Sequence, residues 1–269
     1  MFLRIKKLFQ LIKFFLKKNF FSNIFAIVLI LKKISLKNRI KKIFNSEKIL
    51  DGPYKSIYIQ YADWKYDNHL PKLLGIYEAE IQKEIIQLSK KNKLKYLINF
   101  GAAEGYHLIS LIKKKYFQYG YAFEIDKLVQ KKLMTNIYNN NLTKKIKVFN
   151  NANFLDVFNN LNNHQLKKSL FLVDIEGGEY SIFNKKNLKY LKSSFFLIEI
   201  HKRQDNNIKN YENFLKKYFK IKILIQTERN PHKLKKLENF SENDKWIMMS
   251  EARSYTMKWV LLYPKNANV

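Results

Sequence analysis

The chain contains no cysteine, and only 7 of its 269 residues are glycine and 4 are proline. Without cysteine, neither a disulfide scaffold nor a Cys-ligated zinc or iron–sulfur site can form. The low glycine and proline content, together with 46% hydrophobic residues, excludes collagen-like and disordered chains. The length fits one large domain with an appendage, or two small domains, with a sizeable buried core. Since nothing indicates an oxidising compartment, we expect a cytoplasmic location.

Arginine is also scarce, because it supplies 5 of the 51 basic residues and lysine supplies the other 46. The formal net charge of +29 invites an interpretation as a nucleic-acid-binding protein. Bidentate recognition of phosphate and guanine, however, favours arginine over lysine. The charge is therefore weak evidence, and we do not expect nucleic acid as a partner. No pattern in the sequence indicates the oligomeric state.

Acidic residues are missing from residues 1–46, which carry twelve of the lysines and arginines. Apolar side chains recur in this segment at helical spacing, and lysines fall elsewhere around the helix. A basic amphipathic helix of this kind lies on an anionic membrane surface, so we expect peripheral contact with the inner face of the membrane. The apolar stripe consists of Phe2, Ile5, Leu8, Phe9, Ile12, Phe15 and Leu16.

A long hydrophobic run is missing too. The uncharged stretch from Asn19 to Leu31 has 13 residues, which as a helix reach about 20 Å against a hydrocarbon core of about 30 Å. Lys32 and Lys33 follow directly, where a secretory signal would carry a small-residue cleavage site. We therefore expect the segment to be retained without spanning the membrane. Two alternatives stay open: a helix packed on the protein itself or on a second subunit, and a single span.

The composition becomes ordinary at the Gly-Pro turn of residues 51–53. We expect three parts: the basic segment 1–46, a helical lead-in over 47–93 with its clearest helix at 73–88, and a domain over 94–269. In the domain, apolar runs of strand length alternate with helical or polar segments, which is typical of a mainly parallel α/β sheet with buried strands. The runs cover residues 96–100, 119–125, 146–149, 170–175, 195–200, 221–225 and 259–263.

The first strand leads into a loop, residues 101–105, whose small residues let a ligand approach the backbone. Glu124 ends the second strand, 23 residues after Gly101, where a carboxylate suits the two hydroxyls of a ribose. The loop carries an acid and lacks both the third glycine of a dinucleotide fingerprint and the lysine of a phosphate loop. These features favour S-adenosyl-L-methionine (SAM), a nucleoside with a positive centre, as the cofactor. The residues expected to bind it are Phe100, Gly101, Ala102, Ala103, Glu104, Gly105, Tyr106, Glu124, Ile125, Asn151, Ala152 and Asp174.

Residues 174–179 have the pattern D-x-E-G-x-E, and residues 198–201 read Ile-Glu-Ile-His. Together with five further stretches, they resemble the FkbM-like group of class I SAM-dependent methyltransferases over about residues 71–264. The resemblance implies a seven-stranded Rossmann-like methyltransferase fold, and methyl transfer to a hydroxyl of a small-molecule or glycan acceptor. Asn99 departs from the acid usual in the first strand. The further stretches are residues 73–80, 99–106, 122–126, 250–253 and 257–259.

Three residues are candidates for catalysis. Asp174 ends the fourth strand, beside the first in this topology, so its carboxylate should face the transferred methyl group. Glu199 and His201 alternate on the fifth strand, so both side chains should point to the same side. We name His201 as the candidate base, because histidine titrates near neutrality, while Asp174 could orient the acceptor hydroxyl or act as the base itself. We expect no metal, although these three residues and Glu176 could gather as hard ligands around Mg²⁺.

Other functions remain open beside an O-methyltransferase. An RNA methyltransferase would use the same fold and cofactor, but the aromatic N-P-P-Y-type loop used for flipped bases is absent after the fourth strand. A non-catalytic membrane-associated binding protein would retain the fold without the chemistry, and the presence of Glu124 and Asp174 argues against that. Tyr77 and Arg253 are further candidates for closing over the cofactor or the acceptor.

Overall fold

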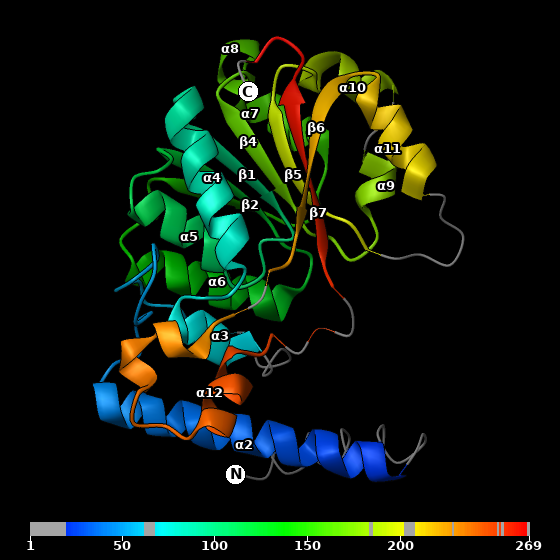
Figure 1. The fold of residues 1–269 in the computed structure, drawn as a ribbon. Helices are drawn as coiled ribbons and strands as arrows, with labels where there is room; N and C mark the ends of the chain where they lie inside the picture. Colours follow the sequence, from blue (N-terminus) through cyan, green and yellow to red (C-terminus); the bar gives the residue numbers. More distant parts are fainter. Residues whose placement is uncertain are drawn as a thin grey trace.

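The computed structural model describes residues 20–61, 68–182, 185–201, 208–227, 229–251, 253 and 256–267. Its centre is a seven-stranded sheet in the order β3-β2-β1-β4-β5-β7-β6, with helices on both faces (Figure 1). Strands β1 to β5 run parallel to one another, and β7 runs antiparallel to its neighbours β5 and β6. The strands are β1 (Tyr96–Phe100), β2 (Tyr119–Phe123), β3 (Ile146–Phe149), β4 (Ser169–Val173), β5 (Phe195–Glu199), β6 (Phe219–Ile225) and β7 (Lys258–Pro264).

The central strands are buried on both faces, which explains their continuous apolar runs. Every residue of β4 and of β5 is buried. β1 lies between β2 and β4, so the strand order reverses beside it. All seven predicted strands are present, with ends shifted by no more than two residues, and the prediction of a mostly parallel α/β sheet is confirmed.

The helices form one layer on each side of the sheet (Figure 1). Helices α4, α5 and α6 pack on one face, in a core cluster that includes Leu97 and Leu172. Helices α7, α8, α10 and α11 pack on the other face, around Phe171 and Phe196. The neighbours Phe171 and Leu172 thus point to opposite faces, as the two-residue period of a strand requires. The bounds are α4 (Ala79–Asn92), α5 (Tyr106–Lys113), α6 (Lys127–Asn139), α7 (Phe154–Asn160), α8 (Asn163–Leu166), α9 (Glu179–Ile182), α10 (Lys185–Leu191) and α11 (Ile208–Lys216).

The lead-in contains a break where the apolar pattern predicts one helix over 73–88. Helix α3 (His69–Leu74) ends at Gly75, and α4 begins only after Glu78. Gly75 has a φ of +81°, and a Cβ on it would lie 2.0 Å from the carbonyl oxygen of Asp51. The prediction of a continuous helix is wrong because the chain turns at Gly75 to contact this distant residue.

Helix α2 (Phe20–Phe44) lies on the side of the sheet where the parallel strands end, against α3 and α12 (Glu242–Met249) (Figure 1). Two short 3₁₀ helices, η2 (Pro231–Lys233) and η3 (Lys235–Leu237), precede α12. Leu36 and Ile40 of α2 are buried in a cluster with Leu73 and Met248. This half of α2 therefore packs on the protein's own body, one of the alternatives left open for the basic segment.

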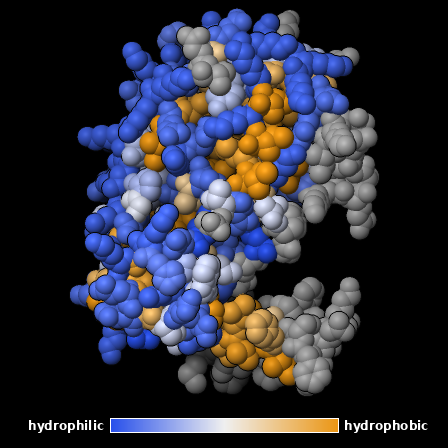
Figure 2. Space-filling model, viewed as in Figure 1, coloured by the Kyte–Doolittle hydropathy of each residue, from blue (hydrophilic) through white to orange (hydrophobic). Residues whose placement is uncertain are grey.

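The first half of α2 exposes an apolar stripe, visible at the base of the molecule in Figure 2. Ile24, Phe25, Val28 and Leu31 are 45%, 69%, 57% and 51% exposed. The amphipathic helix predicted within residues 2–16 lies outside the described residues. None of the helices that the structure describes is long and apolar enough to cross a membrane.

Candidate active site

The ends of β1 and β4 meet through their backbones. Asp174 donates its N–H to the carbonyl oxygen of Phe100 at 3.0 Å. A Cβ on Gly101 would lie 1.7 Å from the carbonyl oxygen of Asp174. Gly101 and Gly105 have φ values of +77° and +90°, which glycine adopts at little cost. Both glycines are therefore required by the shape of the loop, which lies directly beside Asp174.

Glu124 follows β2, and two backbone N–H groups fix its carboxylate. Ala103 donates to Oε2 at 2.8 Å, and Asp126 donates to Oε1 at 2.9 Å. These contacts tie the end of β2 to the loop that follows β1. Ile125, the next residue, is 75% exposed. A fixed carboxylate beside an exposed apolar side chain suits a ribose and its base, and the roles of Glu124 and Ile125 in binding the cofactor stay predictions.

Glu104 faces the interior of the protein. Its carboxylate forms an ion pair with the ammonium group of Lys72, and the two side chains are 2% and 6% exposed. Burial acts to raise the pKa of Glu104, but Lys72 outweighs burial and the net pKa is lowered. The sequence pattern predicted that this acid attracts a positively charged cofactor. Its charge is instead balanced by Lys72, so the negative charge at this edge comes from other residues.

The remaining residues predicted to bind the cofactor differ in exposure. Those buried in the core can offer a ligand mainly their backbone, and their cofactor contacts stay a prediction. Asn99 is also internal, because its amide nitrogen donates to the carbonyl oxygen of Leu172 at 3.3 Å. In the structure Phe100, Ala102 and Tyr106 are buried, Ala103 and Ala152 are half-buried, and Asn151 is exposed.

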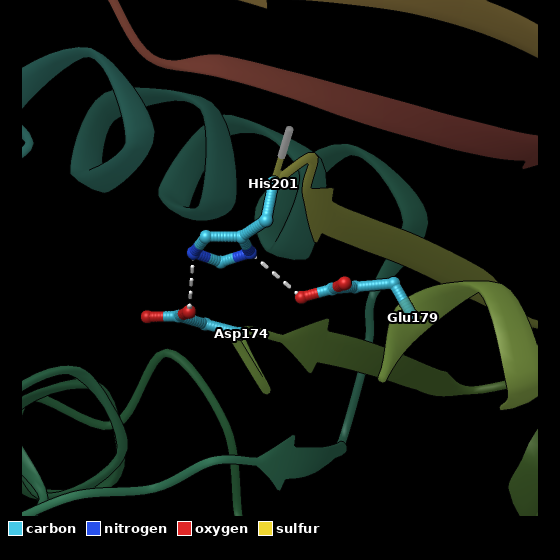
Figure 3. Close-up of side chains that lie close together, drawn as sticks. All are labelled: Asp174, Glu179 and His201. Carbon is cyan, nitrogen blue, oxygen red and sulfur yellow. Dashed lines mark hydrogen bonds and ion pairs between the residues drawn. The ribbon is translucent and has the colours of Figure 1, made fainter. Parts of the chain in front are cut away.

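His201 follows β5, and its imidazole lies between Glu179 and Asp174 (Figure 3). Nδ1 lies 2.8 Å from Oε1 of Glu179, and Nε2 lies 3.6 Å from Oδ1 of Asp174. Glu179, the first residue of α9, is fully buried, and its Oε1 also accepts from the N–H groups of Ile175 and Gly177. The structure thus brings Asp174 and His201 together. It adds Glu179, the last acid of the D-x-E-G-x-E pattern, which the sequence analysis did not name as a site residue.

The carboxylates around His201 set its charge. Burial acts to lower the pKa of His201, but the hydrogen bond that its Nδ1–H donates to Glu179 and the charge of Asp174 outweigh burial, so the net pKa is raised. For Glu179, burial acts to raise the pKa, and the hydrogen bond with His201 reverses this, so the net pKa is lowered. The neighbouring carboxylates therefore favour the imidazolium form, which acts against a role of His201 as a base.

Glu199 ends β5 and points to the same side as His201, as predicted, with its Oε1 3.9 Å from Nε2. Its closer partner is Arg253, whose Nη1 lies 2.7 Å from the same oxygen. Burial, then the charges of Asp174 and Glu78, raise the pKa of Glu199 to about 10. Burial and the neighbouring carboxylates therefore favour the protonated form of Glu199, which makes it poorly suited to act as a base.

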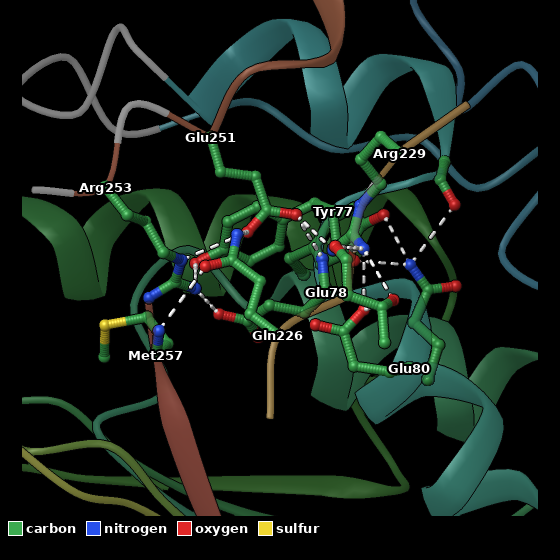
Figure 4. A network of polar contacts seen from close by, with 12 residues as sticks. Tyr77, Glu78, Glu80, Gln226, Arg229, Glu251, Arg253 and Met257 are labelled. Carbon is green, nitrogen blue, oxygen red and sulfur yellow. Dashed lines mark hydrogen bonds and ion pairs between the residues drawn. The ribbon is translucent and has the colours of Figure 1, made fainter. Parts of the chain in front are cut away.

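Arg253 joins three separate segments of the chain beside the site (Figure 4). Its guanidinium contacts Glu78 before α4, Glu199 at the end of β5 and Glu251 after α12. Oε1 of Glu251 in turn accepts from the backbone N–H of Glu78 at 3.0 Å and from Arg229 at 2.6 Å. Sequence reasoning missed Glu78, Glu251 and Arg229 as parts of one network. Two of them lie in stretches that carry the family resemblance, which was the available signal.

Comparison with known proteins gives the fold a class. No protein-family model matches the chain, and no curated protein does, but solved structures match. The methyltransferase domain of METTL16 is 14% identical, with a TM-score of 0.50, and the match covers 78% of this chain and 74% of that one. The likeness shows the fold: this chain has the Rossmann-like fold of class I SAM-dependent methyltransferases, and that prediction is confirmed.

Two further matches were solved with cofactor or product. Streptococcus pneumoniae Sp1610, in complex with SAM and described as a tRNA (m1A22) methyltransferase, is 14% identical over 71% of this chain and 74% of its own, with a TM-score of 0.46. TrmK of M. capricolum, in complex with S-adenosyl-homocysteine, is 14% identical over 69% of this chain and 68% of its own, with a TM-score of 0.43.

Proposed function

We propose that this protein is an FkbM-like, SAM-dependent methyltransferase that methylates a hydroxyl of a sugar, glycan or related small molecule. The observation that carries the proposal is that Glu124, Asp174 and His201 lie at one edge of the sheet, at the ends of β2, β4 and β5. Ligands of such sheets bind outside the carboxyl ends of the strands, where strand order reverses. In this proposal residues 94–269 form the methyltransferase domain and residues 47–93 its lead-in.

Residues after β1 and β2 would hold SAM. Glu124 would accept the ribose hydroxyls, Ile125 would cover the base, and the backbone at Gly101 and Ala103 would line the pocket. The carboxylates of Glu124 and Asp174 would favour the positive charge of this cofactor. Glu104 would contribute little to this attraction, because its charge is balanced by Lys72. When bound, SAM supplies a methyl group on a sulfonium, which is a good leaving group.

Asp174 and His201 would hold the acceptor hydroxyl. The hydroxyl oxygen would accept the methyl group that bound SAM supplies, and the hydroxyl proton would pass to Nε2 of His201 or to Asp174. Placing the acceptor in line can contribute several kcal/mol. Removing its proton typically contributes about 10²- to 10⁴-fold. Glu179 would keep the imidazole in position through Nδ1.

Helix α2 would attach the enzyme to an anionic membrane face. Its exposed apolar stripe from Ile24 to Leu31 continues, on the same side of the helix at 100° per residue, into the exposed residues Lys32, Arg39 and Lys42. Apolar surface combined with positive charge is typical of helices that lie in the membrane interface. Because α2 lies on the side where the parallel strands end, the methyl-transfer site would be near the bilayer (Figure 1). A lipid-linked glycan would then be within reach as acceptor.

Incubation with methyl-labelled SAM tests this function. Full-length protein is mixed with fractionated lipid-linked glycans, soluble sugars and RNA, and the labelled product is identified. Label in an alkali-stable methyl ether of a sugar is expected, and Asp174→Asn should abolish it while SAM still binds. Label in RNA alone would favour the RNA methyltransferase alternative. No label in any fraction, with SAM bound, would favour a non-catalytic membrane-associated protein.

A further inference from the structure

A hollow lies near the beginning of the parallel strands, at the opposite end of the sheet from the candidate active site. It has a volume of about 400 Å³, which falls within the range of small-molecule sites in proteins. The first residues of β1, β2 and β3 line it. Its lining includes no aspartate or glutamate, and its aromatic and charged residues are Tyr96, Tyr119, Tyr121, Lys144, Lys145 and Lys147.

The strand register places tyrosines beside lysines on one face of the sheet. Tyr96 of β1 pairs with Tyr119 of β2. Tyr121 of β2 pairs with Lys147 of β3. Two residues earlier along the same two strands, Tyr119 lies at the level of Lys145. Because side chains alternate between the faces of a sheet, these tyrosines and lysines share one face, and positive charge lies next to the aromatic rings.

Tyr119 offers an open aromatic surface. Its ring stacks on that of Tyr96, with the centroids 5.7 Å apart and the planes 18° from parallel. The hydroxyl of Tyr96 accepts a hydrogen bond from Nε2 of Gln165 at 3.0 Å, which fixes the inner ring. Within the described part of the chain no other ring contacts Tyr119, which is 44% exposed. A planar base would extend this stack as a third ring, and such stacking accepts every base.

Tyr121 supplies a hydrogen-bond donor to the hollow. The residue is 8% exposed, and its hydroxyl forms no hydrogen bond with any residue that the structure describes. Burial, followed by the neighbouring hydroxyls of Tyr96 and Tyr119, raises the pKa of Tyr121, so the phenol keeps its proton. Buried polar groups in folded proteins nearly always have a partner. An oxygen of a ligand in the hollow would accept from this hydroxyl.

The lysines of the hollow keep their charge available to a ligand. Lys144 and Lys145 are exposed, and neither forms an ion pair with a described residue. Nζ of Lys147 donates to the side-chain oxygen of Asn160 at 2.9 Å, and this partner is neutral. Ammonium and hydroxyl donors together suit the oxygens of a phosphate group. The hollow therefore combines an aromatic surface with donors for an anion.

We propose that this hollow binds a nucleotide. The base stacks on Tyr119, and the phosphate accepts hydrogen bonds from Tyr121 and from the lysines. A free nucleotide and a single strand of RNA share this chemistry. Because the hollow and the candidate active site lie at opposite ends of the strands, the nucleotide is distinct from the cofactor and the acceptor. The inference therefore does not rest on the proposed function.

Calorimetric titration of UMP, uridine and inorganic phosphate into the full-length protein tests the site. Uridine compounds are used because an adenine nucleotide would also fit the proposed cofactor site. One UMP per chain should bind, more tightly than uridine or inorganic phosphate, and its affinity should fall as salt rises. A decamer of uridylate distinguishes the two sources. Tighter binding of the decamer than of UMP would identify RNA, and no gain over UMP would identify a free nucleotide.

Two tyrosine variants separate the contacts of the phosphate from those of the base. Tyr121→Phe removes one hydroxyl and keeps the ring, so it should weaken UMP binding about tenfold and leave uridine binding unchanged. A purely structural role of the hydroxyl would not distinguish these two ligands. Tyr119→Leu should weaken the binding of both by at least about fivefold, because the base loses its stacking surface.

A pair of lysine variants tests the charge. Lys144→Gln with Lys145→Gln should weaken UMP binding about tenfold and reduce its dependence on salt. Lys216→Gln with Lys217→Gln changes two adjacent exposed lysines at the end of α11, and this matched control should bind like the wild type. Thermal unfolding shows whether each variant is folded.

Two results would overturn the inference. The first is a folded wild type that binds neither UMP nor the uridylate decamer. The second is an equal loss of binding in the two double-lysine variants, which would mean that the net charge of +29 attracts anions without a specific site. The lysines beside β3 would then serve only to protect an open edge of the sheet.

Discussion

Lys72 of α3 and Glu104 of the loop after β1 form an ion pair inside the protein. Lys72 also lies over the rings of Tyr77 and Tyr106, at 5.0 Å and 5.8 Å from their centroids. The pair joins the helical lead-in to the loop that the cofactor would approach. The shape of the loop therefore depends on a segment outside the sheet. Loss of this ion pair should lower both the stability of the fold and the affinity for the cofactor.

Lys72→Met should destabilise the fold. It leaves the carboxylate of Glu104 buried without its counter-ion, and removal of one partner of a buried pair costs about 3–5 kcal/mol. The double variant Lys72→Met with Glu104→Gln removes both charges and should recover most of this loss. Urea unfolding at pH 7 measures all three proteins. A single variant as stable as the wild type would mean that water or another cation reaches Glu104.

The same pair predicts an acid dependence of stability. The pKa of Glu104 is lower in the folded protein than its ordinary value of 4.5. Its contribution is therefore fully present above pH 4.5 and is lost as pH falls through the lower, folded pKa. Unfolding free energies between pH 7 and pH 3 should fall less steeply in the double variant than in the wild type. Equal slopes would exclude Glu104 as a source of the acid sensitivity.

Gly101→Ala should damage the site through the backbone. The positive φ costs an L-residue about 1–2 kcal/mol, and the new Cβ would overlap the carbonyl oxygen of Asp174. Stability and SAM affinity should both drop. Gly120→Ala is the control, because its φ is ordinary for an L-residue and its Cβ would meet side-chain carbons of Leu108, Ile146 and Ile112, at 3.0–3.4 Å, and no backbone atom among the nearest contacts. Differential scanning calorimetry compares the two, and an equal loss at both positions would contradict the argument.

The apolar stripe of α2 should control membrane binding. Phe25→Ser with Val28→Ser removes two exposed apolar side chains without touching Leu36 or Ile40, so the protein should remain folded. Sedimentation with vesicles rich in phosphatidylserine should be lost or strongly reduced. Ile225→Ser, at a residue 58% exposed on β6, should bind like the wild type. Unchanged sedimentation of the double variant would remove α2 from the membrane contact.

The sheet could be predicted from the sequence because its strands are short, apolar and separated by regular segments. A strand that is buried on both faces has a continuous run of apolar residues, so β4 and β5 could be predicted without knowledge of their neighbours. The glycines at 101 and 105 and the acid at 124 are likewise local features of strand ends. The helix break at Gly75 could not be predicted, since its cause is a contact with Asp51.

The ion pairs of the site could not be predicted from the local sequence. Glu104 belongs to the expected loop, but its partner Lys72 lies 32 residues earlier, so its pairing is invisible in the loop itself. Arg253 contacts Glu78 across 175 residues, and neither position has a distinguishing spacing. Residue types at strand ends predicted that acids gather at this edge. Which acid is neutralised, and by what, depends on tertiary packing.

Calorimetric titration of SAM into the full-length protein and into Glu124→Ala tests the central claim most directly. The wild type should bind one SAM per chain. Glu124→Ala should bind about 1–3 kcal/mol more weakly, because the ribose hydroxyls lose their acceptor. Glu238→Ala, at a residue outside the candidate site, should match the wild type. Absence of SAM binding by the folded wild type, or equal affinity in Glu124→Ala, would contradict the account.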